Sequence, residues 1–199
     1  MSRTYHHGAL AEAMVEQALS DVRERGEEQL SLRAVAHAVG VSPSAAYNHF
    51  ADKDALLRAV GVCGLAAMDE RMARVLAAYP SPDAASAMDR LKGLGRAYMN
   101  FAVDEPHLFR LVFGPTCAEL SQHASDSGPY RKLIDALDEL DRLGLLKSGV
   151  RPGLDVTIWA ATHGVASLMV DGALPPEASD ALLDSVGRLI LRDNVDMSG

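Results

Sequence analysis

The chain has 199 residues, of which 48% are hydrophobic and 23% charged, and its formal net charge is −8. This length suits one packed globular unit or two small ones. Its two cysteines, Cys63 and Cys117, match no metal-binding or redox spacing, and no apolar stretch reaches the roughly 20 residues that span a bilayer. The opening MSRTYHHGAL lacks the apolar run of a signal peptide, so we expect a cytoplasmic protein without a membrane partner.

Apolar residues recur at helical spacing and no strand-like alternation occurs, so the sequence predicts an all-α fold. A first helix is expected over residues 7–25, with one apolar face made of Leu10, Met14, Ala18, Leu19 and Val22. Residues 31–58 then have the order of a short helix, a turn and a second short helix. This is the layout of a helix-turn-helix DNA-binding unit.

Capping residues mark the two short helices. Ser31 is placed to cap the first, and Gly40 ends it, because only glycine adopts the left-handed conformation at little cost. Ser42 is placed to cap the second helix, expected over residues 44–50, with Pro43 at its first position. A helix this short must be held by its neighbour, and the sequence suggests that it is held through Ala46, Tyr47 and Phe50.

The later helices predict a separate body. They are expected over residues 52–78, 83–103, 106–113, 130–146, 154–170 and 177–193, with a polar loop over 121–129. Asp52 and Asp83 are placed to cap two of them, and Pro106 begins a third.

Helix 154–170 indicates a partner, because it carries no charge between Asp155 and Asp171. A helix that is apolar all round is buried on more than one side. The helix after it carries an apolar stripe made of Leu182, Val186, Leu189 and Ile190. We expect these two helices to form a homodimer with their copies, and small residues such as Gly164 to permit close approach. The alternative is that helix 154–170 is only a buried core helix.

Three strings resemble a known family. VSPSAAYNHFADKDALL, residues 41–57, resembles the signature of the tetracycline-repressor (TetR) family of bacterial transcription regulators. TYHHGAL and WAATHGVASLMVDG, residues 4–10 and 159–172, resemble segments of the subset with a C-terminal Trp-His-Gly domain. One departure is that Ser44 and Ala46 stand where many members have Gly and Leu.

The resemblance implies a helix-turn-helix DNA-binding domain over residues 1–55 and a helical effector-binding and dimerisation domain over 56–199. It implies a repressor that a small-molecule effector releases from a double-stranded DNA operator, working as a homodimer through its last two helices. The alternative interpretation is a helical small-molecule-binding or scaffold protein without DNA function. The chain has no Gly-rich phosphate loop, HExxH or Gly-x-Ser-x-Gly motif, so we expect no enzyme, no cofactor and no metal.

The expected DNA contacts surround the second short helix, which enters the major groove in units of this kind. Tyr47 and His49 are expected to contact phosphates or bases, and Lys53 a phosphate; Tyr47 has packing as its alternative role. The complete set is Arg3, Ser42, Ser44, Ala45, Tyr47, Asn48, His49 and Lys53. Charge opposes this interpretation, since residues 1–58 hold more acids than bases, but most of those acids precede the helix-turn-helix.

The resemblance also implies that helices between residues 52 and 146 enclose the effector. Composition supplies nine candidates, which are Met68, Met72, Tyr98, Met99, Phe101, Phe109, Phe113, Trp159 and His163. The six expected contacts among them are Met68, Met99, Phe109, Phe113, Trp159 and His163. Trp159 and His163 are four residues apart and share a helix face. For each of the six, packing in the core is the alternative role.

Overall fold

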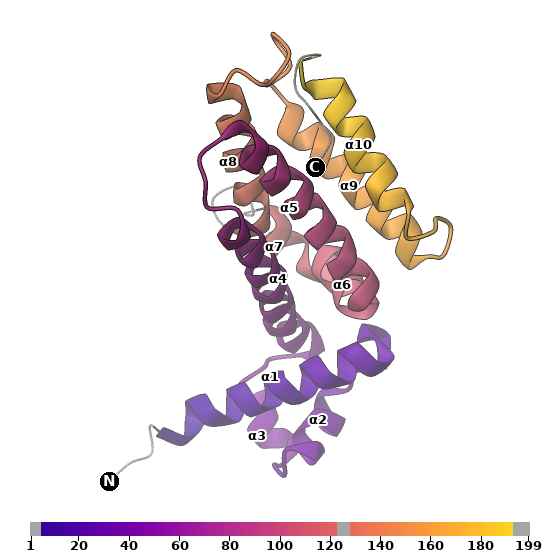
Figure 1. The fold of residues 1–199 in the computed structure, drawn as a ribbon. Helices are drawn as coiled ribbons and strands as arrows, with labels where there is room; N and C mark the ends of the chain where they lie inside the picture. Colours follow the sequence, from indigo (N-terminus) through magenta and orange to yellow (C-terminus); the bar gives the residue numbers. More distant parts are fainter. Residues whose placement is uncertain (1–4, 123–127, 193–199) are drawn as a thin grey trace. The chain divides into compact units, whose positions relative to one another are not determined.

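The protein is described by a computed structural model over residues 5–122 and 128–192, with side chains described over residues 9–120 and 128–192. The helices are α1 Tyr5–Arg25, α2 Leu32–Ala38, α3 Pro43–Tyr47, α4 Lys53–Ala78, α5 Ala84–Asp104, α6 Pro106–Phe113, α7 Ala118–Gln122, α8 Gly128–Arg142, α9 Leu154–Val170 and α10 Ala178–Ile190 (Figure 1). Two short 3-10 turns are η1 Glu27–Gln29 and η2 Pro115–Cys117. In these described residues the single β pairing is an isolated bridge between Leu146 and Leu191. The predicted all-α fold is confirmed.

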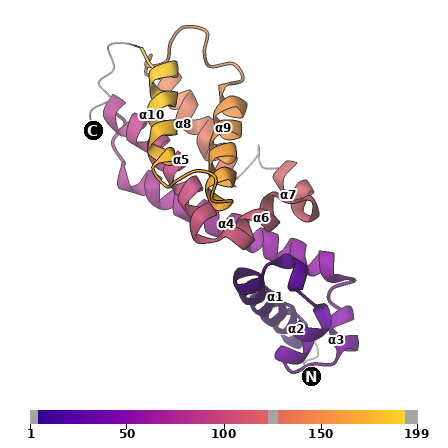
Figure 2. The same ribbon diagram turned by 90° about the vertical axis from the view of Figure 1, so that its right-hand side faces the viewer.

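The chain divides into two compact units. The head unit comprises Met1–Ala66 and Glu105–Gln122, and the body unit comprises Ala67–Asp104 and His123–Gly199. The first part of helix α4 therefore belongs to the head unit, and the rest of it belongs to the body unit. Figures 1 and 2 show α1, α2 and α3 gathered in the head, and α5, α8, α9 and α10 lying alongside one another in the body.

The turn of the helix-turn-helix is built around Gly40. Its φ of 78° lies in the left-handed region, as the sequence predicted. The amide of Gly40 donates to the carbonyl of His37 at 3.0 Å, and that of Val41 donates to the carbonyl of Ala36 at 2.9 Å. These two bonds close the end of α2 and turn the chain toward α3.

Side-chain caps begin α3 and α4 but not α2. The Ser42 hydroxyl accepts from the Ala45 amide at 3.2 Å, and the Asp52 carboxylate accepts from the Ala55 amide at 2.7 Å. Ser31 stands at the expected position with extended backbone, but its side chain makes no capping bond, so that part of the prediction is wrong.

Helix α3 is shorter than the predicted 44–50, because it ends at Tyr47. The amides of His49 and Phe50 both donate to the carbonyl of Ala46 at 3.0 Å, which turns the chain out of the helix. Ala46 is fully buried and Phe50 nearly so, whereas Tyr47 is 48% exposed. Ala46 and Phe50 therefore hold the helix, and the expected packing role of Tyr47 is wrong.

Two glycines of α4 let α6 and η2 pack directly on its backbone within the head unit. A Cβ added at Gly64 would stand 2.6 Å from Cγ2 of Val112, and one at Gly61 would stand 2.5 Å from Sγ of Cys117. Real Cβ atoms do not approach so closely, because protein interiors are close-packed. Burial raises the pKa of the Cys117 thiol to about 11, so this cysteine is a packing residue.

Helix boundaries in the second half of the chain differ from prediction. Residues 118–122 form α7 rather than the start of a loop, and α8 ends at Arg142 instead of near residue 146. The residues after Gly144, whose φ is 68°, pair instead with the end of α10. The Lys147 amide donates to the Ile190 carbonyl at 2.8 Å, and the Arg192 amide to the Leu145 carbonyl at 3.0 Å.

The core of the body unit gathers side chains from α5, α8, α9 and α10. Helix α9, predicted over 154–170 and observed over Leu154–Val170, buries Ile158, Thr162 and Ala166. The apolar stripe predicted on α10 does not face one way, because Ile190 is 4% exposed whereas Leu189 is 71% exposed. Among the helices that are described, none is long and apolar enough to cross a membrane.

Candidate DNA interface and effector site

Helix α3 and the residues that flank it directly carry most of the predicted DNA contacts. Ser42, Ser44, Tyr47 and Asn48 are exposed, while Ala45 and His49 are partly exposed. The one inward residue of α3 is Ala46, which is fully buried. The side chains at the start of this helix are short, and the exposed Tyr47 is its last residue. Arg3 lies outside the described residues.

Lys53 stands at the first turn of α4, near the end of the helix-turn-helix. Its Nζ donates to the backbone carbonyl of Glu28 in η1 at 3.1 Å. The side chain is partly exposed, so this bond leaves donors for another acceptor, since a lysine ammonium has three. Lys53 therefore joins the turn after α1 to the start of α4.

Two head-unit cations in the last turn of α1 are already paired with acids. Arg23 Nε lies 3.0 Å from Glu105 at the start of α6, and Arg25 lies 2.6 Å from Asp21. Arg33 and Arg58 are exposed. Arg23 and Arg25 are thus engaged within the head unit, the first with the start of α6 and the second within α1.

The six predicted effector contacts fall in both units. Phe109 and Phe113 belong to the head unit, where their ring centroids are 5.0 Å apart and Phe109 is 3% exposed. Met68 and Met99 belong to the body unit and are fully buried. Trp159 and His163 are partly exposed on α9.

His163 contacts the hydroxyl of Tyr98 on α5, and Trp159 packs beside His163 on α9. The Tyr98 oxygen lies 2.8 Å from Nδ1 of His163, and the ring centroids of Trp159 and His163 are 5.9 Å apart. Burial raises the pKa of Tyr98 far above its ordinary value, although Trp159 acts in the opposite direction. Burial also lowers the pKa of His163, so both groups are neutral near pH 7.

A second tyrosine, Tyr130 on α8, completes this aromatic cluster. Its ring stands edge-on to Trp159 with centroids 5.7 Å apart, and its hydroxyl donates to Asp155 at 2.7 Å. Burial and then Asp155 raise the pKa of Tyr130 to about 12. The bond from Tyr130 lowers the pKa of Asp155, which Arg151 also contacts. Tyr130 was not predicted as a site residue, because nothing in the sequence near it marks this contact.

An open hollow of about 400 Å³ in the body unit contains none of the six predicted effector contacts; its lining is Leu76, Tyr79, Pro80, Pro82, Arg90, Lys132, Asp135, Ala136, Glu139 and Arg142. Arg90 is its most buried charged group, at 7% exposed.

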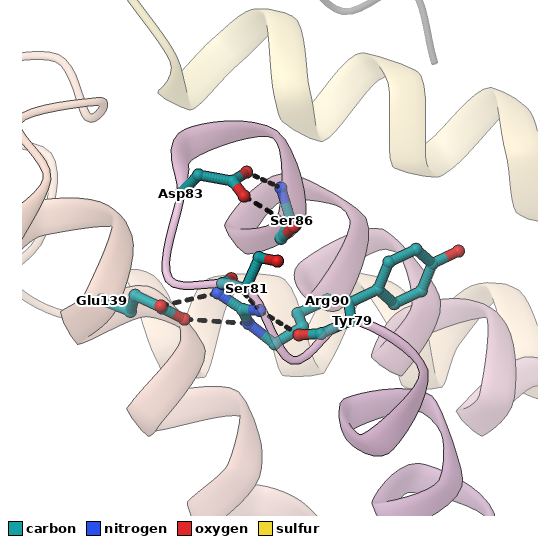
Figure 3. Close-up of polar contacts among 6 residues, drawn as sticks. All are labelled: Tyr79, Ser81, Asp83, Ser86, Arg90 and Glu139. Atoms are coloured by element: carbon teal, nitrogen blue, oxygen red, sulfur yellow. Dashed lines mark hydrogen bonds and ion pairs between the residues drawn. The ribbon is translucent and has the colours of Figure 1, made fainter.

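Arg90 fixes the connection between α4 and α5 (Figure 3). Its Nε and Nη2 donate to the two carboxylate oxygens of Glu139 on α8, at 3.1 and 2.6 Å. Its Nη1 donates to the carbonyls of Tyr79 and Ser81, the latter at 2.9 Å. Asp83, which caps α5 as predicted, accepts from the Ser86 amide at 2.8 Å. The arginine thus ties the end of α4 to α8.

Comparison with known proteins supports the helix-turn-helix interpretation. Residues 15–60 match the bacterial regulatory proteins of the tetR family, and residues 91–190 match the tetracyclin repressor-like C-terminal domain. The chain belongs to the TetR family. It is therefore a DNA-binding transcription regulator of the effector-controlled kind, as residues 41–57 indicated. No curated protein matches the chain in sequence.

Solved structures similar to this TetR-family chain share its fold over most of their length. A Rhodococcus sp. RHA1 protein of unknown function is 25% identical, with a TM-score of 0.76 over 96% of this chain and 100% of that one. SmeT in complex with triclosan is 19% identical, with a TM-score of 0.68 and 96% of each chain covered. RolR in complex with resorcinol is 12% identical, with a TM-score of 0.68, covering 94% of this chain and 90% of that one.

Proposed function

We propose that this TetR-family regulator is a homodimeric, cytoplasmic repressor that a small molecule releases from its operator. The observation that carries the DNA part is the division of α3 into a buried Ala46 and an outer face with an exposed Tyr47. An exposed aromatic residue on a short helix that its neighbour holds is available to a partner. We propose a binding role and no catalysis.

The proposed DNA contacts come from α3 and its flanks. Ser42, Ser44, Ala45, Tyr47, Asn48 and His49 face the major groove or its phosphates, Lys53 binds a phosphate, and Arg3 reaches DNA from the chain's start. The backbone carbonyl of Glu28 orients Lys53 for this contact.

For the effector we propose a small aromatic molecule in contact with Met68, Met99, Trp159 and His163 of the body unit. The support is that all four side chains are neutral, with burial holding His163 uncharged. Triclosan and resorcinol, bound in the SmeT and RolR structures, are molecules of this class and are the first to test.

The proposal is tested with labelled DNA from upstream of the protein's own gene. Fluorescence anisotropy is expected to show saturable binding that unlabelled copies of the same DNA displace and random DNA does not. Adding triclosan or resorcinol in a concentration series then tests release. Equal affinity for upstream and random DNA would overturn the operator proposal, whatever the compounds do.

The proposed dimer uses the outward faces of α9 and α10. Val156, Leu168 and Leu189 are 57%, 45% and 71% exposed there. Gly164 stands in the middle of α9, and apart from its own helix backbone no atom of the described residues lies within 4 Å of where a Cβ would be. Glycine in a helix interior costs about 0.5–1 kcal/mol relative to alanine, and no contact in the described part of the protomer requires it here. Close approach of a second α9 supplies a reason.

We expect Gly164→Leu to convert the dimer to a folded monomer at micromolar concentration, because the added side chain has room in the protomer but not against a second helix. Light scattering measures the mass, and circular dichroism confirms the helices. Ala77→Leu, at an exposed position of α4, is the matched control and should remain dimeric. A dimeric Gly164→Leu would place the interface elsewhere.

A further inference from the structure

Helix α9 has little in its apolar pattern to define which side faces inward. It carries no charge between Asp155 and Asp171, and apolar residues surround it. The structure buries Ile158 at 8% exposure, yet leaves Val156 and Leu168 more than five times as exposed. Burial of apolar area is not directional, so it distinguishes poorly between these faces. A directional contact is needed to select one rotation of α9 about its own axis.

Tyr98 provides that contact. It is 4% exposed on α5, and its hydroxyl oxygen lies 2.8 Å from Nδ1 of His163 on α9. A hydroxyl can donate and accept, and a neutral imidazole has one nitrogen of each kind, so this pair forms one directed hydrogen bond between α5 and α9.

One rotation of α9 brings His163 to this hydroxyl. Trp159 is one helical turn away on the same face, and its ring packs beside that of His163 with centroids 5.9 Å apart. Another rotation of α9 would break the bond between the buried Tyr98 hydroxyl and His163, which is costly away from water. Buried polar groups set register in this way in apolar coiled coils.

We propose that Tyr98 is a positioning residue that sets the rotation of α9 and thereby selects the face that α9 presents to a second copy of the chain. This inference rests on the proposed homodimer. It gives His163 of the Trp-x-x-x-His segment a structural role through a polar atom. The ring faces of Trp159 and His163 are still available to an effector.

The test is the distance between two spin labels in the full-length dimer, measured by pulsed electron paramagnetic resonance. The labels are attached at Ala77→Cys, an exposed site outside the proposed interface, with Cys63→Ser removing the partly exposed native thiol. The parent protein is expected to give one narrow distance. Tyr98→Phe, which removes only the hydroxyl, is expected to give at least two distances or a distribution at least twice as wide, while the mass stays dimeric.

Matched variants separate positioning from general loosening. Tyr79→Phe alters an exposed tyrosine of the same unit and should keep the narrow distance. His163→Asn retains an acceptor near the place of Nδ1 and should keep it too, whereas His163→Leu should broaden it. If circular dichroism shows that Tyr98→Phe does not fold, His163→Asn and His163→Leu are compared by the same spin-label distance, and their difference decides the test.

Two results have separate meanings. A parent protein that is monomeric by light scattering refutes the homodimer and, with it, this role of Tyr98. A dimeric parent whose narrow distance persists in both Tyr98→Phe and His163→Leu overturns the role of Tyr98 alone.

Discussion

Replacing Glu139 with leucine is expected to lower the free energy of unfolding by about 3–5 kcal/mol, because it leaves a buried guanidinium without its counter-ion. Arg90 is 7% exposed and has two of its donors on this carboxylate. The carbonyls of Tyr79 and Ser81 remain as partners but carry no charge. Urea denaturation at one fixed protein concentration measures the change.

Two controls identify the cause of that loss. The double variant Arg90→Met with Glu139→Leu removes both charges and is expected to be more stable than Glu139→Leu alone. Asp135→Ala breaks an exposed pair with Arg131 on the same helix, where the side chains are 58% and 49% exposed, and should cost no more than about 1 kcal/mol. A loss for Glu139→Leu as small as that of Asp135→Ala would show that water solvates Arg90.

Tyr47→Ala is expected to weaken operator binding roughly 30-fold or more without unfolding the protein. A base or phosphate contact contributes on the order of 1 kcal/mol or more, a dimer makes each contact twice, and every 1.4 kcal/mol is about tenfold. The side chain is 48% exposed, so truncation removes little packing. Anisotropy titration with one operator at one salt concentration measures the loss.

Tyr79→Ala is the control for that experiment, since it removes a tyrosine of similar exposure from the body unit. Lys53→Ala should also weaken binding, but its bond to Glu28 means that part of its effect comes from the fold. Unchanged affinity in both Tyr47→Ala and Lys53→Ala would mean that another element contacts the DNA.

Helix starts were predicted more accurately than helix ends, for a physical reason. Asp52, Asp83 and Pro106 act within one turn of their own position, so the sequence nearby contains the signal. The end of α8 depends on pairing between residues 145–147 and the residues after α10, more than 40 positions away. No local pattern encodes such a contact. The early end of α3 likewise depends on how Ala46 and Phe50 pack.

The candidate site also has features that the local sequence predicts and features that depend on contacts between distant residues. The helix-turn-helix was evident from its order of caps, glycine and apolar residues, and the family match confirms it. The hydrogen bond between Tyr98 and His163 was not predictable, because α5 and α9 meet only in the fold. Arg90 and Glu139 are 49 positions apart and gave no signal for the same reason.

Trp159 is the chain's single tryptophan, so the intrinsic ultraviolet emission of the protein comes from one indole next to Tyr98, Tyr130 and His163. Indole emission is sensitive to hydrogen bonding and to neighbouring rings. A change in its emission wavelength or intensity therefore reports on the contact of α5, α8 and α9, and not on α3. Compounds that act on the body unit can be screened by the change they cause in this tryptophan fluorescence, in the absence of DNA.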